Sequence, residues 1–195
     1  MALFRDLNDA NKGEYMQCYL LAYTKDDSGN IRVLIAQKKL HSAFITNMGV
    51  KQSKSSVPDY AGQWVIVGGK IKLQEKPQAA GLRAFKEATG LDLASTFNYT
   101  LFRTETLTDK YGYDFSCTYV ALTEAEAEEL TAQGNINIAE GFDGELAHDE
   151  IKQVAWLPLA EARKQLNSKV EVAERYEEKA YQSRDWWDLI LNKVK

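Results

Sequence analysis

The sequence predicts an α/β or α+β fold in which helices pack against one mixed β-sheet. Two pairs of apolar, β-prone segments are each joined by a short polar turn, which is typical of antiparallel hairpins. A segment with helical spacing follows a glycine pair, and another follows a late strand. Because strands and helices alternate and hairpins interrupt the alternation, we expect a mixed sheet rather than a purely parallel one.

The first hairpin is predicted from residues 16–23 and 31–36, which are apolar and flank the turn-forming stretch TKDDSGN. Residues 41–62 show no periodicity and contain loop-forming stretches such as KQSKSS. A loop of this length in a compact domain is either functional or a tolerated surface insertion. Residues 64–67 (WVIV) are expected to form a short buried strand that ends at a pair of glycines.

A helix is predicted over residues 76–89. Pro77 suits its first turn, where an N–H group has no helical partner. Gly90 suits its C-cap, where the backbone often turns left-handed. One apolar side of this helix is expected to pack on the sheet and to contain Ala79, Leu82 and Phe85.

A second hairpin is predicted from residues 99–107 and 113–122, which are joined by a turn around TDKYG. Thr123 and Glu126 have the spacing of a capping box. A short acidic helix should therefore begin there and end before the loop that we expect at 134–144.

The last third of the sequence predicts a strand at 150–157, a helix at 158–166 and a longer helix at 170–194. Apolar residues on this last helix fall on one stripe, formed by Val172, Tyr176, Ala180, Trp187, Ile190 and Val194. The helix either completes the core or forms a homodimer interface.

The composition excludes several classes of protein. The 195 residues carry a formal net charge of −4, so broad electrostatic binding to nucleic acid or an anionic membrane is not expected. No apolar run approaches the roughly 20 residues that span a bilayer, and the N-terminal residues lack the apolar core of a signal peptide. We therefore expect a cytoplasmic protein. Cys18 and Cys117 are expected to be buried thiols.

The segment 69–91 carries the residue pattern that points to chemistry. Gly69 is followed by five residues and Glu75, and then by seven residues and Arg83; further on come Glu87, Gly90 and Leu91. This spacing resembles the Nudix box, which runs Gly, five residues, Glu, seven residues, Arg-Glu, an aliphatic residue, one residue, Glu-Glu, one residue, Gly and an aliphatic residue. The matching positions are Gly69, Glu75, Arg83, Glu87, Gly90 and Leu91. The pattern departs at Ala84 and Ala88, where the family has glutamates, and Phe85 occupies the first aliphatic position.

The resemblance extends over about residues 15–167, because the strand before the box and the late strand with its helix also match the family. It implies a Nudix-type α/β/α sandwich, with one domain over 1–195 and a C-terminal helical extension over about 168–195. It also implies a metal-dependent hydrolase that uses Mg²⁺ or Mn²⁺. Such a pyrophosphatase would cleave the diphosphate linkage of a nucleoside diphosphate linked to another moiety.

The expected metal ligands are Glu87, the Gly68 carbonyl and Glu150, because hard divalent cations bind carboxylate and carbonyl oxygens. The expected catalytic residues are Glu87, Arg83 and Glu150. An ordinary i,i+4 ion pair between Arg83 and Glu87 is the competing interpretation. Weaker candidates for an additional acid in the site are Asp109, Asp143, Glu145 and Asp149.

The expected substrate contacts are Gly69, Lys70 and Tyr111. Glycine lets the backbone approach a phosphate closely, and a lysine neutralises its charge. A tyrosine in a loop offers a ring that can stack on a base. The expected partner is therefore a nucleotide-like small molecule that contains a diphosphate.

Three explanations fit the two alanines of the box. The protein binds its ligand without hydrolysing it, or it hydrolyses the ligand with acids from other loops. Alternatively, two glutamates of an active hydrolase have been replaced. The first and second explanations place the protein in different classes, a binding module and an enzyme.

Overall fold

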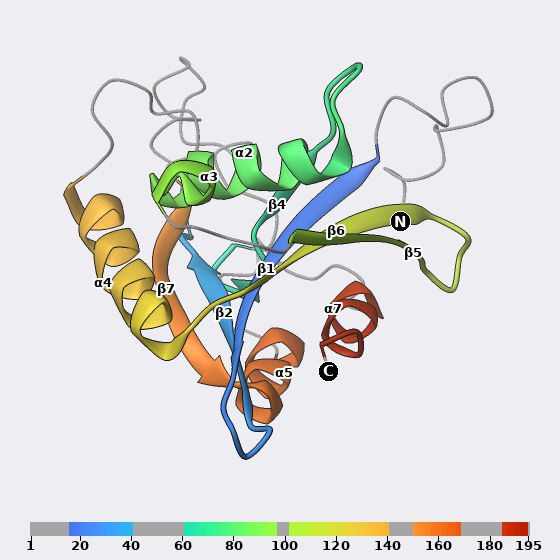
Figure 1. Ribbon diagram of the computed structural model, residues 1–195. Helices are drawn as coiled ribbons and strands as arrows, with labels where there is room; N and C mark the ends of the chain where they lie inside the picture. The colour runs from blue at the N-terminus through green and yellow to red at the C-terminus, as the bar shows by residue number, and fades with distance from the viewer. Residues whose placement is uncertain (1–15, 41–60, 97–101, 141–149, 169–184, 195) are drawn as a thin grey trace.

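The centre of the computed structural model is one mixed β-sheet with helices on both faces (Figure 1). The structure describes residues 16–40, 61–96, 102–140, 150–168 and 185–194. Most of the predicted loop at 41–62 therefore lies outside the described residues. No helix among these residues is long and apolar enough to cross a membrane.

Among the described residues the sheet has seven strands, and β3, β2, β1, β6 and β5 form its main path. In addition, β4 pairs with β1, and β7 pairs with β2. The β1–β6 pair is parallel and the other pairs are antiparallel, which confirms the predicted mixed sheet. The strands are β1 (Gln17–Lys25), β2 (Ile31–Lys38), β3 (Trp64–Val65), β4 (Gly68–Lys70), β5 (Phe102–Thr108), β6 (Asp114–Ala121) and β7 (Ile151–Pro158).

The strand β1 organises the part of the sheet that carries the box. Its Gln17 pairs with Lys70 of β4 on one side and with Phe115 of β6 on the other. After Lys70 the chain leaves β4 toward the helix that begins at Pro77, and before Phe115 it enters β6 from the β5–β6 turn. The loop after β4 and the turn before β6 therefore leave the sheet at the same end of β1.

The helices cover the sheet in two layers, as the predicted sandwich requires. Figure 1 shows α2 and α4 on one side and α5 and α7 on the other. The helices are α2 (Pro77–Thr89), α3 (Leu93–Thr96), α4 (Glu124–Glu140), α5 (Leu159–Asn167) and α7 (Asp185–Leu191). Because both faces are covered, residues 18–22 of β1 are all buried, as expected for a central strand.

Local signals placed several helix ends correctly. Pro77 lies in the first turn of α2, and Gly90 closes the helix with a φ of 71°. Thr123 and Glu126 form the predicted capping box, because each accepts a hydrogen bond from the other's backbone N–H, at 3.2 and 2.7 Å. Both hairpins are also confirmed.

The packed face of α2 differs from the prediction. Ala79 is exposed and Leu82 is only partly buried, whereas Phe85 is buried as expected. The helix buries a neighbouring strip of mostly small residues instead, which are Ala80, Gly81, Ala84, Phe85, Ala88 and Thr89. Small side chains let the helix axis lie close to the sheet, which hydropathy spacing alone does not reveal.

The helix α4 continues to Glu140, so the loop predicted from residue 134 is wrong over 134–140. Tertiary contacts override the weak helix propensity of this stretch. The side chain of Asn135 accepts the Val154 N–H at 2.9 Å and donates to the Val154 carbonyl at 3.0 Å. Asn137 donates to the carbonyl of Thr89 at 3.2 Å, which ties α4 to the end of α2.

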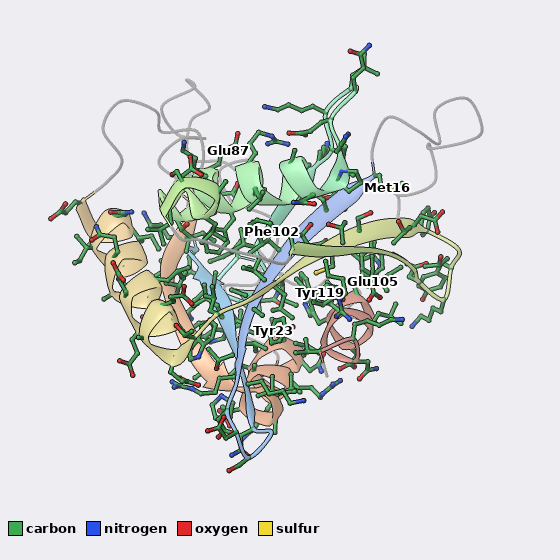
Figure 2. The ribbon with its side chains drawn as sticks, viewed as in Figure 1. Met16, Tyr23, Glu87, Phe102, Glu105 and Tyr119 are labelled. Carbon is green, nitrogen blue, oxygen red and sulfur yellow. The ribbon has the colours of Figure 1, made fainter. Side chains whose placement is uncertain are left out.

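The described part of the C-terminal extension packs into the core. Trp187, Ile190 and Val194 are buried, as the predicted apolar stripe requires. The helix ends at Leu191 rather than at Val194, and the rest of the predicted stripe lies outside the described residues. Figure 2 shows Glu105 and Tyr119 on the side of the sheet that faces α7. The Tyr119 hydroxyl donates to the Ile190 carbonyl at 3.1 Å.

Gly68 and Gly69 of β4 should differ in how well they tolerate a side chain. A Cβ atom on Gly68 would lie 2.4 Å from both the Cys18 carbonyl oxygen and a ring carbon of Tyr19. We expect Gly68→Ala to lower the free energy of unfolding by about 2–3 kcal/mol. At Gly69 the nearest contact would be 3.2 Å from the Ala84 Cβ, so Gly69→Ala should cost less than about 1 kcal/mol. Urea denaturation of both variants tests this ranking, and equal losses would contradict it.

Candidate functional site

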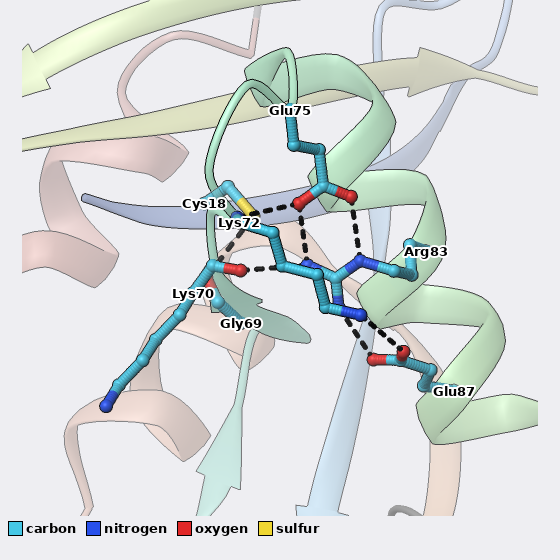
Figure 3. Close-up of polar contacts among 7 residues, drawn as sticks. All are labelled: Cys18, Gly69, Lys70, Lys72, Glu75, Arg83 and Glu87. Carbon is cyan, nitrogen blue, oxygen red and sulfur yellow. Dashed lines mark hydrogen bonds and ion pairs between the residues drawn. The ribbon is translucent and has the colours of Figure 1, made fainter. Parts of the chain in front are cut away.

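The side chain of Arg83 lies at the centre of the predicted site (Figure 3). It points from α2 toward residues 71–76, the segment between β4 and α2, which we call the box loop. Its Nε and Nη2 atoms donate to the two carboxylate oxygens of Glu75 at 2.8 and 2.9 Å. Such a two-point pair fixes both the distance and the orientation of the carboxylate.

The same guanidinium reaches two further acceptors. Its Nη1 atom donates to Glu87 at 2.9 Å, and its Nη2 atom donates to the carbonyl of Lys70 at 2.8 Å. We call this arrangement of Arg83 with Glu75, Glu87 and the Lys70 carbonyl the Arg83 clamp. It ties the end of β4, the box loop and two turns of α2 together. The i,i+4 pair of Arg83 with Glu87 is present, and a role of Arg83 in positioning the site stays a prediction.

The Arg83 clamp keeps Glu75 ionised. Hydrogen bonds from Arg83 and from the Lys72 N–H lower the pKa of Glu75 from 4.5 to about 2, although burial opposes the shift. A carboxylate with a lowered pKa stabilises the fold above its ordinary pKa. This contribution is lost only as the pH falls from about 4.5 toward 2. Glu75 therefore stays ionised at any pH near neutrality.

A buried thiol supports the box from the other side. The Cys18 Sγ donates to the Gly69 carbonyl at 3.2 Å, and burial raises the pKa of this thiol to about 11. Both cysteines are free and buried, which confirms the expectation for them. Cys18 is thus a neutral donor that helps to hold β4, a role that its sequence context does not suggest.

The two alanines of the box face inward. Ala84 is 5% exposed and Ala88 is 9% exposed, and Ala88 belongs to the hydrophobic core cluster. Glu87 lies on the same helix with 26% of its side chain exposed and is the acid that remains there. Its carboxylate is held by Arg83, and Lys72 lies 4.0 Å away.

Glu150 lies just before β7 and engages a different partner. Its carboxylate pairs with Lys38 Nζ at 2.5 Å, and its carbonyl accepts the Lys39 N–H at 2.7 Å. The Lys38 ammonium group neutralises the Glu150 carboxylate, whose negative charge would otherwise attract a metal ion. The role of Glu150 as a metal ligand or catalytic residue therefore stays a prediction, and an additional step must free it from Lys38.

The donor set does not fit a hard divalent cation well. Within the described ranges, no group of three or more His, Cys, Asp or Glu side chains could hold a metal ion. One carboxylate shared with an arginine and a backbone carbonyl provide few of the six oxygen ligands that Mg²⁺ requires. Asp143, Glu145 and Asp149 lie outside the described residues. The described residues alone therefore do not form a site for a hard divalent cation.

The expected substrate contacts lie at the same end of the sheet. The backbone of Gly68, Gly69 and Lys70 forms β4, with the Lys70 side chain exposed and extending away from the Arg83 clamp (Figure 3). Tyr111 lies in the β5–β6 turn and is 66% exposed. The register around Gln17 places this turn and the box loop at the same end of β1.

Asp109 holds the β5–β6 turn together, and its place as an additional acid of the site stays a prediction. It is 9% exposed, and its Oδ1 atom accepts the backbone N–H groups of Tyr111 and Tyr113 at 2.8 and 2.9 Å. The sequence offers one signal for this, since aspartate at the start of a turn often accepts backbone N–H groups two and more residues on. The Oδ2 atom of Asp109 also accepts the indole N–H of Trp186 at 2.9 Å, a contact between distant segments that the sequence did not predict.

Comparison with known proteins identifies a family model and several solved structures. The NUDIX domain model matches residues 41–178, which is more than half of the chain. No curated protein matches the sequence.

The solved structures that resemble this chain share little sequence with it. A mutT/nudix family protein from Listeria innocua is 17% identical, with a TM-score of 0.45 over 77% of this chain and 82% of that chain. An Ap4A hydrolase from C. elegans is 17% identical, with a TM-score of 0.42 over 76% and 84%. The NUDIX domain of Shewanella oneidensis NrtR, complexed with ADP ribose, is 16% identical, with a TM-score of 0.43 over 89% and 90%.

Proposed function

Because the chain belongs to the NUDIX domain family, we propose that it binds a nucleoside diphosphate linked to another moiety and hydrolyses the diphosphate slowly. The observation that carries this proposal is the combination of an intact Arg83 clamp with two buried alanines on the same helix. The Arg83 clamp supports ligand binding, and the alanines account for a weak chemical step.

Binding is supported by the arrangement of backbone and charge around the box loop. The Arg83 clamp holds the Lys70 carbonyl and Glu75, so the loop between them has a defined shape before a ligand arrives. Lys70 and Lys72 are both exposed there and provide positive charge next to that loop. A preformed loop with lysines suits a diphosphate, because little ordering is needed when the ligand binds.

We attribute the slow hydrolysis to the absence of two carboxylates on α2, at positions 84 and 88. Cleavage of a diphosphate near neutral pH usually requires groups that neutralise the phosphates and activate water. Alanine at positions 84 and 88 can do neither, and Glu87 is the acid that remains there. Water attack on phosphorus would therefore depend on Glu87, with help from the substrate's own phosphate oxygens.

A second candidate is a binding module that senses a nucleotide without cleaving it. The position of Ala88 in the hydrophobic core cluster favours this function, since that part of α2 serves packing rather than chemistry. The two candidates share the ligand and differ only in turnover.

Incubation with a substrate panel separates the two candidates. The panel contains ADP-ribose, NAD, a sugar nucleotide and a dinucleoside polyphosphate, each with Mg²⁺ or Mn²⁺. We expect slow release of phosphate-bearing products from at least one compound, and Glu87→Gln should abolish it. The matched control is Glu128→Gln on α4, which removes an exposed carboxylate elsewhere and should leave the rate unchanged. Saturable binding without product would instead favour the binding module, and the absence of both would contradict the proposal.

A further inference from the structure

The C-terminal helix contacts the β5–β6 turn through one tryptophan. The Trp186 indole N–H donates to the Oδ2 atom of Asp109 at 2.9 Å. The Trp186 ring also stacks on Phe115 with a centroid distance of 4.7 Å and an interplanar angle of 15°, and it meets Tyr19 edge-on at 5.8 Å. Trp186 therefore lies between the sheet and the turn, far in sequence from both.

The turn that Trp186 reaches, residues 109–113, is held by several hydrogen bonds that converge on Asp109, and we call it the tyrosine turn. Its backbone closes through the Asp109 N–H to the Tyr113 carbonyl and the Gly112 N–H to the Asp109 carbonyl, both at 3.0 Å. The Asp109 carboxylate accepts two more N–H groups, from Tyr111 and Tyr113, and then the indole N–H. Burial raises the pKa of Asp109, but these donors outweigh it and hold the pKa below its usual range.

The tyrosine turn presents aromatic and positive side chains at the same end of β1 as the box loop. Tyr111 is 66% exposed and Tyr113 is 45% exposed. The Lys110 Nζ lies 5.1 Å from the centre of the Tyr111 ring. Phe115, two residues beyond the turn, is separated from Lys70 by β1 alone, which corresponds to about 10 Å across two strand spacings. The box loop and this turn therefore lie at the same end of β1, and a ligand that spans them would bring an attached base to Tyr111.

We propose that Trp186 is a positioning residue that fixes the tyrosine turn, so that Tyr111 forms an aromatic wall for the base of the bound nucleotide. Base stacking on an aromatic ring contributes about 1–3 kcal/mol per base, and it depends on the ring being held in place. This inference rests on the proposed nucleotide binding and gives the C-terminal helix a function beyond closing the core.

Hydrogen exchange tests the positioning step without any ligand. Trp186→Phe retains a ring that can stack on Phe115 and removes the indole N–H. We expect the backbone amides of Tyr111 and Tyr113 to exchange about tenfold faster in this variant, as for the loss of one hydrogen bond to a charged group. Asp109→Asn should act in the same direction, because its amide cannot accept all three N–H groups.

The matched control removes a different contact of the same helix. Tyr119→Phe deletes the hydrogen bond to the Ile190 carbonyl, which lies on α7 away from the tyrosine turn. We expect it to leave the exchange of the two turn amides unchanged. If Trp186→Phe changes their exchange no more than Tyr119→Phe does, the positioning role is wrong.

Calorimetric titration with ADP-ribose tests the ligand step. We expect Tyr111→Ala and Trp186→Phe each to weaken binding by about tenfold, whereas Tyr119→Phe should not change it. If the wild-type protein binds ADP-ribose and both variants bind equally well, the aromatic wall is wrong. If the wild-type protein binds no compound of the panel, the proposed function fails, and the exchange experiment still decides the role of Trp186.

Discussion

Replacing Arg83 with alanine is expected to lower the free energy of unfolding by about 2–3 kcal/mol. The variant loses four hydrogen bonds at once and leaves two acids without their main cation. The side chains of Glu75 and Glu87 are only 16% and 26% exposed, so water compensates poorly for the lost charge. Urea denaturation at neutral pH measures the loss. The Lys70 carbonyl is released too, so the affinity for the ligand should fall along with stability.

The control for Arg83→Ala lies three residues away on the same helix. Lys86 pairs with Asp92 at 2.8 Å, but both side chains are well exposed, at 57% and 38%. An exposed ion pair contributes little, so Lys86→Ala should cost less than about 1 kcal/mol. Arg83→Lys should recover only part of the loss, because an ammonium group cannot form the two-point pair with Glu75. The Arg83 clamp would lose its proposed importance if Arg83→Ala cost no more than Lys86→Ala.

Placing glutamates at the two alanine positions is expected to raise turnover. With Mg²⁺ present, the double variant Ala84→Glu/Ala88→Glu should hydrolyse the compound that the wild type cleaves fastest at least about a hundredfold faster than the wild type does. This gain corresponds to a decrease of about 2.7 kcal/mol in the activation free energy. Stability should fall by about 1–3 kcal/mol at the same time, because both positions are buried. Initial rates of product release and urea denaturation measure the two effects.

The control for this gain places the same charge elsewhere on α2. Gln78→Glu/Ala79→Glu adds two acids near the start of the helix, where Ala79 is exposed and Gln78 is partly buried. This variant should not accelerate hydrolysis. A folded Ala84→Glu/Ala88→Glu protein with no gain in rate would show that the alanines do not limit the chemistry. A large gain would favour the explanation in which the two glutamates of an active hydrolase have been replaced.

The parts of the fold that the sequence predicted are those with local signals. Pro77 and Gly90 bound α2 correctly, and Thr123 with Glu126 placed the start of α4, because caps and turns depend on a few neighbouring residues. The i,i+4 spacing of Arg83 and Glu87 also predicted their ion pair, whereas the contact of Arg83 with Glu75 was not predicted.

What the sequence could not predict depends on contacts between distant segments. The helix α4 extends past residue 134 because Asn135 bonds to Val154, nineteen positions away. The exposure of Ala79 was not predicted, because helical spacing did not distinguish it from Ala80, which packs on the sheet. Pairings such as Lys38 with Glu150 and Trp186 with Asp109 join residues that only the folded sheet brings together.

The central claim is that this Nudix domain retains a ligand-binding scaffold while its hydrolytic step is weak. The most direct measurement is a calorimetric titration of the wild-type protein with ADP-ribose, in EDTA and in Mg²⁺, with product analysis of both samples. We expect saturable binding of ADP-ribose in both conditions, with dissociation constants within about tenfold of each other. Turnover should stay below about 0.01 per second, which is about a hundredfold under the lower end of the roughly 1–1000 per second of typical enzymes. Binding that requires Mg²⁺, together with turnover in that typical range, would contradict the account.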